Sequence, residues 1–143
     1  MAHLSESITV NASRETIWSL LTTPAKILQW FVGLDTVNAS ADYPAVGSYI
    51  EGAYKVMGIE LKAKQTVTAM TPGEMIHYQL EGIVSGAQNW DVTPAGDGLQ
   101  ITVTMDYTMS GGVLGRVAEP AVHQVNLANA KKSLENIKQL AEN

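Results

Sequence analysis

The chain has 143 residues, which fits a single domain over residues 1–143 and is long enough to bury a sizeable core. It has no cysteine, which excludes disulfides and thiolate metal sites, and its net charge of −5 with only nine scattered basic residues disfavours binding to nucleic acid. Because it has neither a basic, apolar leader nor a run of about 18 apolar residues, we expect a cytoplasmic protein without a transmembrane segment.

The N-terminal part predicts a strand followed by two short helices. Residues 4–10 alternate loosely and end in β-branched side chains, as is typical of a strand. Residues 11–13 then offer capping oxygens to a helix over residues 14–21, whose apolar side chains share one face. A proline ends this helix, and a second short helix is expected over residues 25–31.

The central part changes to a period of two, which predicts strands. Short turn sequences that contain Gly, most of them with Pro or Ser, separate the runs, and such short links favour an antiparallel meander. The expected strands lie near residues 37–41, 48–56, 60–69, 75–83, 88–93 and 99–109.

The alternation predicts which face of the sheet is inside, because polar and charged side chains fill the other face of each strand. On neighbouring strands it places Tyr54, Tyr78 and Trp90 inside. In the run 60–69 the inner residues are Leu61, Ala63, Gln65, Val67 and Ala69. In the run 99–109 they are Leu99, Ile101, Val103, Met105, Tyr107 and Met109.

The C-terminal part predicts a long helix over residues 113–140 that lies along the sheet. Pro120 lies well inside it and removes a backbone hydrogen bond, so we expect a bend near Glu119. One apolar stripe consists of Leu114, Val117, Ala121, Val125 and Ala128. A neighbouring stripe consists of Leu127, Ala130, Leu134, Ile137 and Ala141.

Several short motifs follow one another in an order that resembles a known superfamily. They are residues 8–18 at the strand-to-helix opening, Val46-Gly47-Ser48, Trp90-Asp91-Val92-Thr93-Pro94 followed by Gly98, and Gly111-Gly112-Val113-Leu114-Gly115. In this order, over essentially the whole chain, they are similar to the polyketide cyclase/dehydrase and lipid transport superfamily, which includes the START domains and the major birch pollen allergen. The stretch from Met105 to Gly112 also resembles the G-subunit proteins of carbon monoxide dehydrogenase.

This resemblance implies an α+β helix-grip fold. In that fold a curved antiparallel sheet of about seven strands wraps around a long C-terminal helix, with two short helices after the first strand, and the predicted elements follow the same order. The resemblance further implies a deep cavity between sheet and helix that holds lipids, polyketides or other hydrophobic molecules. The fold alone does not specify the chemistry that occurs there.

Large side chains on the predicted inner face are the candidates for ligand binding. Aromatic rings with a polar tip orient a mostly apolar ligand, although ordinary core packing would explain the same residues. Gln65 is more informative, because a buried amide without partners costs about 1–3 kcal/mol and therefore calls for a partner, a water or a ligand. The candidate ligand-binding residues are Trp30, Tyr54, Gln65, Tyr78, Trp90, Met105, Tyr107, Val117 and Ala121.

His123 is the candidate general acid or base. It lies one helical turn after Glu119, so an imidazole that leans inward and pairs with this carboxylate is sterically allowed; a solvated surface pair is the competing interpretation. The histidines are not spaced as a metal-binding set and no nucleotide-binding motif occurs, so neither a metal nor another cofactor is expected.

Three hypotheses for function follow, and whether the chain is an enzyme stays open. The first is binding of a small hydrophobic molecule (lipid, polyketide or aromatic compound) in the cavity. The second is a polyketide cyclase or dehydratase that uses His123 and a tyrosine as acid and base in the same cavity. The third is a protein-interaction or assembly module, which predicts an exposed apolar patch. The sequence leaves a homodimer open.

Overall fold

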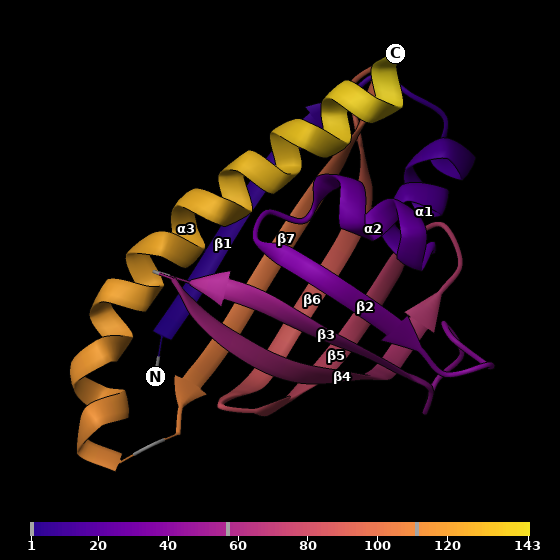
Figure 1. Ribbon diagram of the computed structural model, residues 1–143. Coiled ribbons are helices and arrows are strands. Elements are labelled where there is room, and N and C mark those ends of the chain that lie inside the picture. The colour runs from indigo at the N-terminus through magenta and orange to yellow at the C-terminus, as the bar shows by residue number, and fades with distance from the viewer. Residues whose placement is uncertain (1, 57, 111) are drawn as a thin grey trace.

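The computed structural model describes residues 2–56, 58–110 and 112–143, with the side chains of residues 56, 59 and 112–117 lying outside this description. The predicted order of elements is confirmed (Figure 1). In chain order the elements are β1 (Ala2–Val10), α1 (Arg14–Thr22), α2 (Pro24–Trp30), β2 (Leu34–Ala39), β3 (Tyr49–Val56), β4 (Ile59–Thr71), β5 (Met75–Gly82), β6 (Val84–Ala95), β7 (Gly98–Met109) and α3 (Gly112–Glu142).

The seven strands form one antiparallel sheet in the order β1-β7-β6-β5-β4-β3-β2. The meander from β2 to β7 is joined at its far edge by β1, because the N-terminal strand pairs with the last one. Helix α3 lies along β1 and β7, and α1 and α2 pack against α3 (Figure 1). This arrangement confirms the expected helix-grip fold.

The two short helices begin and end where their sequences indicate. The hydroxyl oxygen of Ser13 accepts a hydrogen bond from the backbone N–H of Thr16 at 3.1 Å and so caps α1. The next helix begins with Pro24, which needs no backbone N–H at the first position. Its residues Ile27 and Trp30 are buried and close one end of the interior.

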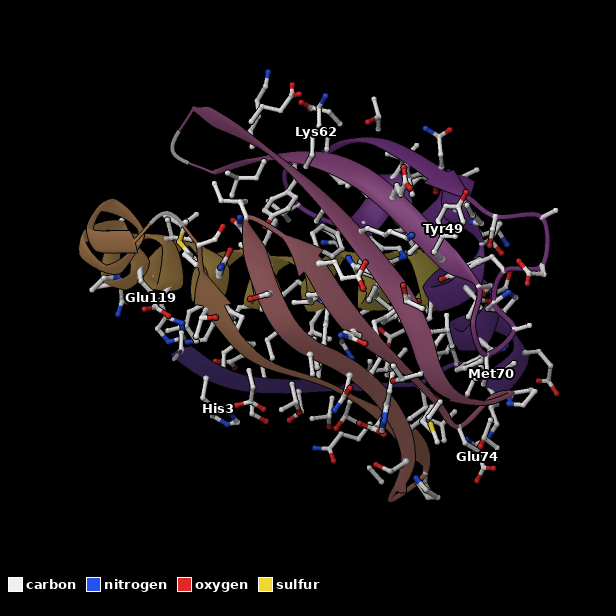
Figure 2. The ribbon with its side chains drawn as sticks, turned by 90° about the horizontal axis from the view of Figure 1, so that it is seen from below. His3, Tyr49, Lys62, Met70, Glu74 and Glu119 are labelled. Atoms are coloured by element: carbon white, nitrogen blue, oxygen red, sulfur yellow. The ribbon has the colours of Figure 1, made fainter. Side chains whose placement is uncertain are left out.

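The predicted inner face of the sheet is confirmed for most strands. Tyr78 and Trp90 are buried, as are Ile101, Val103 and Tyr107 on β7. Their neighbours on the other face are polar and accessible, and Figure 2 shows the side chains of His3 and Lys62 on the outside of the molecule. One face of the sheet is apolar and the other is solvent-exposed. The register of each strand is therefore strongly determined, because a shift by one residue would turn its apolar side chains to solvent.

One residue of β4 departs from the prediction. Val67 pairs with Tyr78, but Ala69 pairs with His77, so Thr68 is an extra residue in a β-bulge. The bulge reverses the alternation, and Met70 packs against the core in place of Ala69. The prediction that Ala69 faces inward is therefore wrong, because simple alternation counts residues and cannot detect an insertion.

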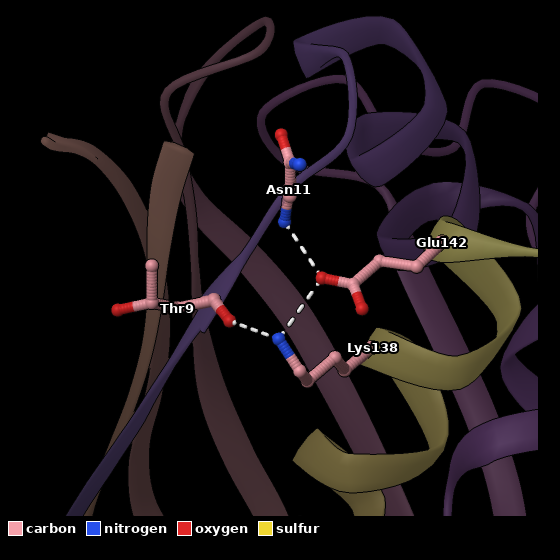
Figure 3. Close-up of polar contacts among 4 residues, drawn as sticks. All are labelled: Thr9, Asn11, Lys138 and Glu142. Atoms are coloured by element: carbon pink, nitrogen blue, oxygen red, sulfur yellow. Dashed lines mark hydrogen bonds and ion pairs between the residues drawn. The ribbon is translucent and has the colours of Figure 1, made fainter. Parts of the chain in front are cut away.

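The C-terminal half of α3 is fixed both by packing and by polar contacts. Leu134 and Ile137 are buried in the main core. Figure 3 shows the carboxylate of Glu142 accepting a hydrogen bond from the backbone N–H of Asn11 at 2.8 Å. The ammonium of Lys138 donates to the carbonyl of Thr9 at 2.8 Å and pairs with Glu142 at 2.9 Å.

The N-terminal half of α3 presents a different face from the one predicted. The helix continues through Pro120, and its first turns in Figure 1 run at an angle to the remainder. Val122 is buried against Leu61, whereas Ala121 and Ala128 are exposed. The predicted inward stripe is wrong for these two alanines, because successive helical residues lie about 100° apart and a small rotation exchanges the inner residue.

Candidate ligand-binding site

A cavity of about 100 Å³ lies between α2, α3 and the inner face of strands β2 to β7. For comparison, an engineered cavity of about 150 Å³ in another protein holds benzene, whereas pockets for drug-sized ligands reach about 300–1,000 Å³. The enclosed space is therefore smaller than that benzene cavity, and a molecule larger than a ring would extend beyond it.

Six of the predicted ligand-binding residues line this cavity. They are Trp30, Tyr54, Gln65, Tyr78, Trp90 and Met105. Three others do not belong to the described wall. Tyr107 lies behind it, hydrogen-bonded to the lining residue Asn126. Ala121 is exposed on the far side of α3, so its predicted inward position is wrong, and the side chain of Val117 lies outside the described part of the chain.

Two tryptophans form a rigid aromatic wall. The rings of Trp30 and Trp90 meet edge to face, with centroids 5.1 Å apart. The indole N–H of Trp30 donates to the carbonyl of Leu20 at 2.7 Å. That of Trp90 donates to the amide oxygen of Gln88 at 3.3 Å. Because both polar tips are satisfied, the two rings present apolar surface to the cavity.

Tyr78 and Tyr43 form a pair of hydroxyls at another part of the wall. The two oxygens are 2.6 Å apart, with Tyr43 reaching in from the connection between β2 and β3. Burial raises the pKa of both phenols, so both stay neutral at physiological pH. Two hydroxyls that share one hydrogen bond retain a second hydrogen that can be donated to a bound molecule.

Besides Gln65 and the two tyrosines, four further residues of the wall carry amide or hydroxyl groups: Gln88, Asn126, Asn129 and Ser133. None of these four was predicted as a ligand-binding residue. The hydroxyl of Ser133 accepts from the backbone N–H of Val32 at 3.1 Å. Neither Gln65 nor Asn129 has a side-chain hydrogen bond to another described residue. Both side chains are partly accessible, so their amides offer donors and acceptors to water or to a bound molecule.

Behind this wall a buried tyrosine contacts the predicted acid/base residue. The hydroxyl of Tyr107 lies 3.0 Å from Nδ1 of His123 and accepts from the side-chain amide of Asn126 at 2.9 Å. Burial raises the pKa of Tyr107, Asn126 lowers it, and the charge of Glu119 raises it. Burial and the nearby Tyr107 raise the pKa of Tyr54 to about 12. A proton can pass between Tyr107 and His123, which itself does not line the described cavity.

The other two histidines lie on strands at the outer face of the sheet. His77 contacts Asp91 at 3.0 Å, and His3 contacts Asp106. Within the described residues no group of three or more His, Asp or Glu side chains could hold a metal ion. None of the helices, as far as their residues are described, is long and apolar enough to cross a membrane.

The fold and the cavity define a helix-grip protein with an internal cavity. The family described as "Polyketide cyclase / dehydrase and lipid transport" matches residues 1–142, and the chain belongs to this family. No curated protein is similar enough in sequence to count as a relative.

Solved structures share the fold at low sequence identity. The protein TTHA0849 from Thermus thermophilus is 12% identical with a TM-score of 0.80, over 98% of this chain and 97% of that one. A START superfamily protein from Mycobacterium smegmatis is 20% identical with a TM-score of 0.76, over 96% and 97%. The di-domain aromatase/cyclase StfQ from the steffimycin biosynthetic pathway is 15% identical with a TM-score of 0.78, over 98% and 50%.

These likenesses show the fold alone, because all three identities are low. The resemblance to the G-subunit proteins of carbon monoxide dehydrogenase is not tested by them and stays a prediction.

Proposed function

We propose that the chain is a single ligand-binding domain over residues 1–143 that holds a small, mostly apolar molecule in the cavity between sheet and α3. The observation that carries this proposal is an apolar and aromatic wall interrupted by amides that have no partner within the described structure. Apolar burial would drive binding at about 25 cal/mol per Å², and the few polar groups would orient the molecule.

The test is to identify what the purified protein carries and whether its cavity can be filled. Organic extraction followed by mass spectrometry reports a bound molecule, and titration with a polarity-sensitive dye reports saturable binding. We expect at least one of these signals. The absence of both a co-purified molecule and saturable dye binding would contradict the proposal.

A matched pair of variants on α3 locates the site. Ala130 lines the cavity and Ala128 is exposed on the same helix. Ala130→Leu should fill the cavity and weaken dye binding at least tenfold, whereas Ala128→Leu should leave it unchanged. Equal effects of the two substitutions, with both proteins folded by circular dichroism, would place the dye elsewhere.

The second candidate function is that of a polyketide cyclase or dehydratase, favoured by the contact between Tyr107 and His123. In a dehydration of a β-hydroxy carbonyl compound, a base takes the proton next to the carbonyl. The hydroxyl then leaves with a proton from the acid, giving a double bond and water. His123 would be that base and Tyr107 that acid, and the proton would return from His123 to Tyr107 through their 3.0 Å contact. Because neither residue lines the described cavity, the substrate would have to extend past Asn126 to reach them. His123→Ala should then abolish loss of water from a β-hydroxy thioester, measured by mass spectrometry, while binding is retained; unchanged turnover would remove His123 from the mechanism.

The interaction-module hypothesis predicts an exposed apolar patch. The exposed large apolar residues of the described chain are distributed over several separate segments: Leu28, Val46, Tyr49, Ile83 and Leu140. This distribution does not favour the interaction hypothesis over the two that use the cavity. The cytoplasmic location remains a prediction of the sequence, and a homodimer stays open.

A further inference from the structure

The described wall of the cavity holds no Asp, Glu, Lys, Arg or His side chain. Its polar groups are the amides and hydroxyls of Gln65, Gln88, Asn126, Asn129, Ser133, Tyr54 and Tyr78. A ligand in the cavity therefore meets both hydrogen-bond donors and hydrogen-bond acceptors. Among the described lining residues it meets no charged side chain that could pair with a charge of its own.

The hydrogen bonds already made determine what is left for a ligand. The amide oxygen of Gln88 accepts from Trp90, so the amide N–H₂ of Gln88 is its remaining polar group. Gln65 and Asn129 each keep both a donor and an acceptor within the described contacts. The raised pKa of Tyr54, about 12, keeps its hydroxyl neutral and able to donate.

This chemistry separates neutral from charged molecules of the same shape. A carbonyl or hydroxyl exchanges its hydrogen bonds with water for bonds to these side chains at little net cost. A carboxylate or ammonium loses its hydration and gains no ion pair, which makes burial unfavourable by a large margin.

Building on the proposed binding function, we propose that the cavity selects uncharged ligands that carry a carbonyl or hydroxyl group, and rejects carboxylates and amines of the same shape. The class includes neutral ketones, amides and phenols. It excludes fatty-acid anions with the head group inside the cavity.

Three single-ring probes matched in size test this selection on the wild-type protein: 4-methylbenzamide, 4-methylbenzoate and protonated 4-methylbenzylamine. Binding is followed at pH 7 by the NMR signals of the indole N–H groups. Trp30 and Trp90 line the cavity, whereas Trp18 does not belong to its described wall and serves as an internal control. We expect the amide to shift the signals of Trp30 and Trp90 and to bind at least tenfold more tightly than either charged probe.

A charge-complementing variant tests the reason for the selection. Gln65→Lys places an ammonium on the wall and should raise the affinity for 4-methylbenzoate at least tenfold over wild type. Gln65→Leu, a neutral control, should leave benzoate binding as weak as in wild type. If the lysine variant does not fold, the comparison of the three probes on wild type still decides the proposal.

The outcomes separate this inference from the binding function itself. A charged probe that binds within tenfold of the amide overturns the selection while the binding function stands. If the dye binds saturably but the amide does not bind, the selection is likewise overturned and the binding function stands. If neither the dye nor the amide binds, both the selection and the proposed function are wrong.

Discussion

The interior has two ends that share one sheet and one helix but differ in content. At the packed end, α3 contributes Leu134 and Ile137, which are buried in the main core. At the cavity end, the same helix contributes Asn126, Asn129 and Ala130, which are smaller or polar and line the void. The comparison indicates that side-chain size and polarity along α3 decide where the interior is open.

The C-terminal end of α3 is also held to β1 by polar contacts. Lys138 and Glu142 join the end of α3 to β1 through Thr9 and Asn11. The Asn11 N–H and the Lys138 ammonium lower the pKa of Glu142, so its carboxylate stays ionised and holds these contacts at neutral pH. The C-terminal end of α3 thus contacts β1 through charged groups, whereas the cavity end contacts its neighbours through uncharged hydrogen bonds, such as that from the backbone N–H of Val32 to Ser133.

The largest expected effect is at the packed end. Leu134→Ala should lower the free energy of unfolding by about 2–5 kcal/mol, because it creates a new void in a region with no space to spare. The matched change at the cavity end, Asn129→Ala, should alter it by less than about 0.5 kcal/mol. Urea unfolding measures both. Similar losses for the two variants would contradict the division into a packed end and a cavity end.

A smaller effect of opposite sign is expected at the cavity end. Gln65→Leu should raise the free energy of unfolding by about 1 kcal/mol, because it replaces an unpaired amide by an apolar side chain. It should also weaken binding of the neutral amide probe. The control Gln79→Leu, on the exposed face of β5, should change stability by less than about 0.5 kcal/mol. A destabilised Gln65→Leu variant would mean that the amide has a partner in solution.

The smallest effect is a pH dependence of the cavity wall. The pKa of Tyr54 is about 12 in the folded chain, against about 10 for an exposed tyrosine. Its contribution to stability is complete below pH 10 and is lost as the pH rises towards 12, because the unfolded state ionises first. The loss should stay well below the limit of about 1.4 kcal/mol per pH unit for one proton. Tyr54→Phe should reduce the loss of stability between pH 8 and 11, and Tyr49→Phe on the surface should not; equal behaviour of the two variants would contradict the assignment.

Most of the sheet could be predicted from the sequence, because a period of two assigns each side chain to one face. The alternation alone places Tyr78, Trp90 and Gln65 on the inner wall, where the structure has them. The β-bulge at Thr68 could not be predicted, because Ala69 and Met70 are both apolar and the sequence accepts either one as the inner residue.

The contribution of α3 to the cavity was missed for a different reason. The helix carries several apolar stripes, and its rotation depends on contacts with a distant part of the chain rather than on its own sequence. A signal was nevertheless present. Asn126, Asn129 and Ser133 recur at spacings of three and four residues, so they form one polar stripe beside the buried Leu134. A polar stripe on a helix that must pack against a sheet predicts a cavity with hydrogen-bonding groups.

The bulge in β4 has a practical consequence for sequence alignment. Before Thr68, the odd-numbered side chains of β4 face the interior. After the extra residue, the even-numbered Met70 faces the interior instead. An alignment with family members that lack this insertion must therefore open a one-residue gap at Thr68. Without the gap, every cavity position on one side of it would be compared with a solvent-facing position in the other protein.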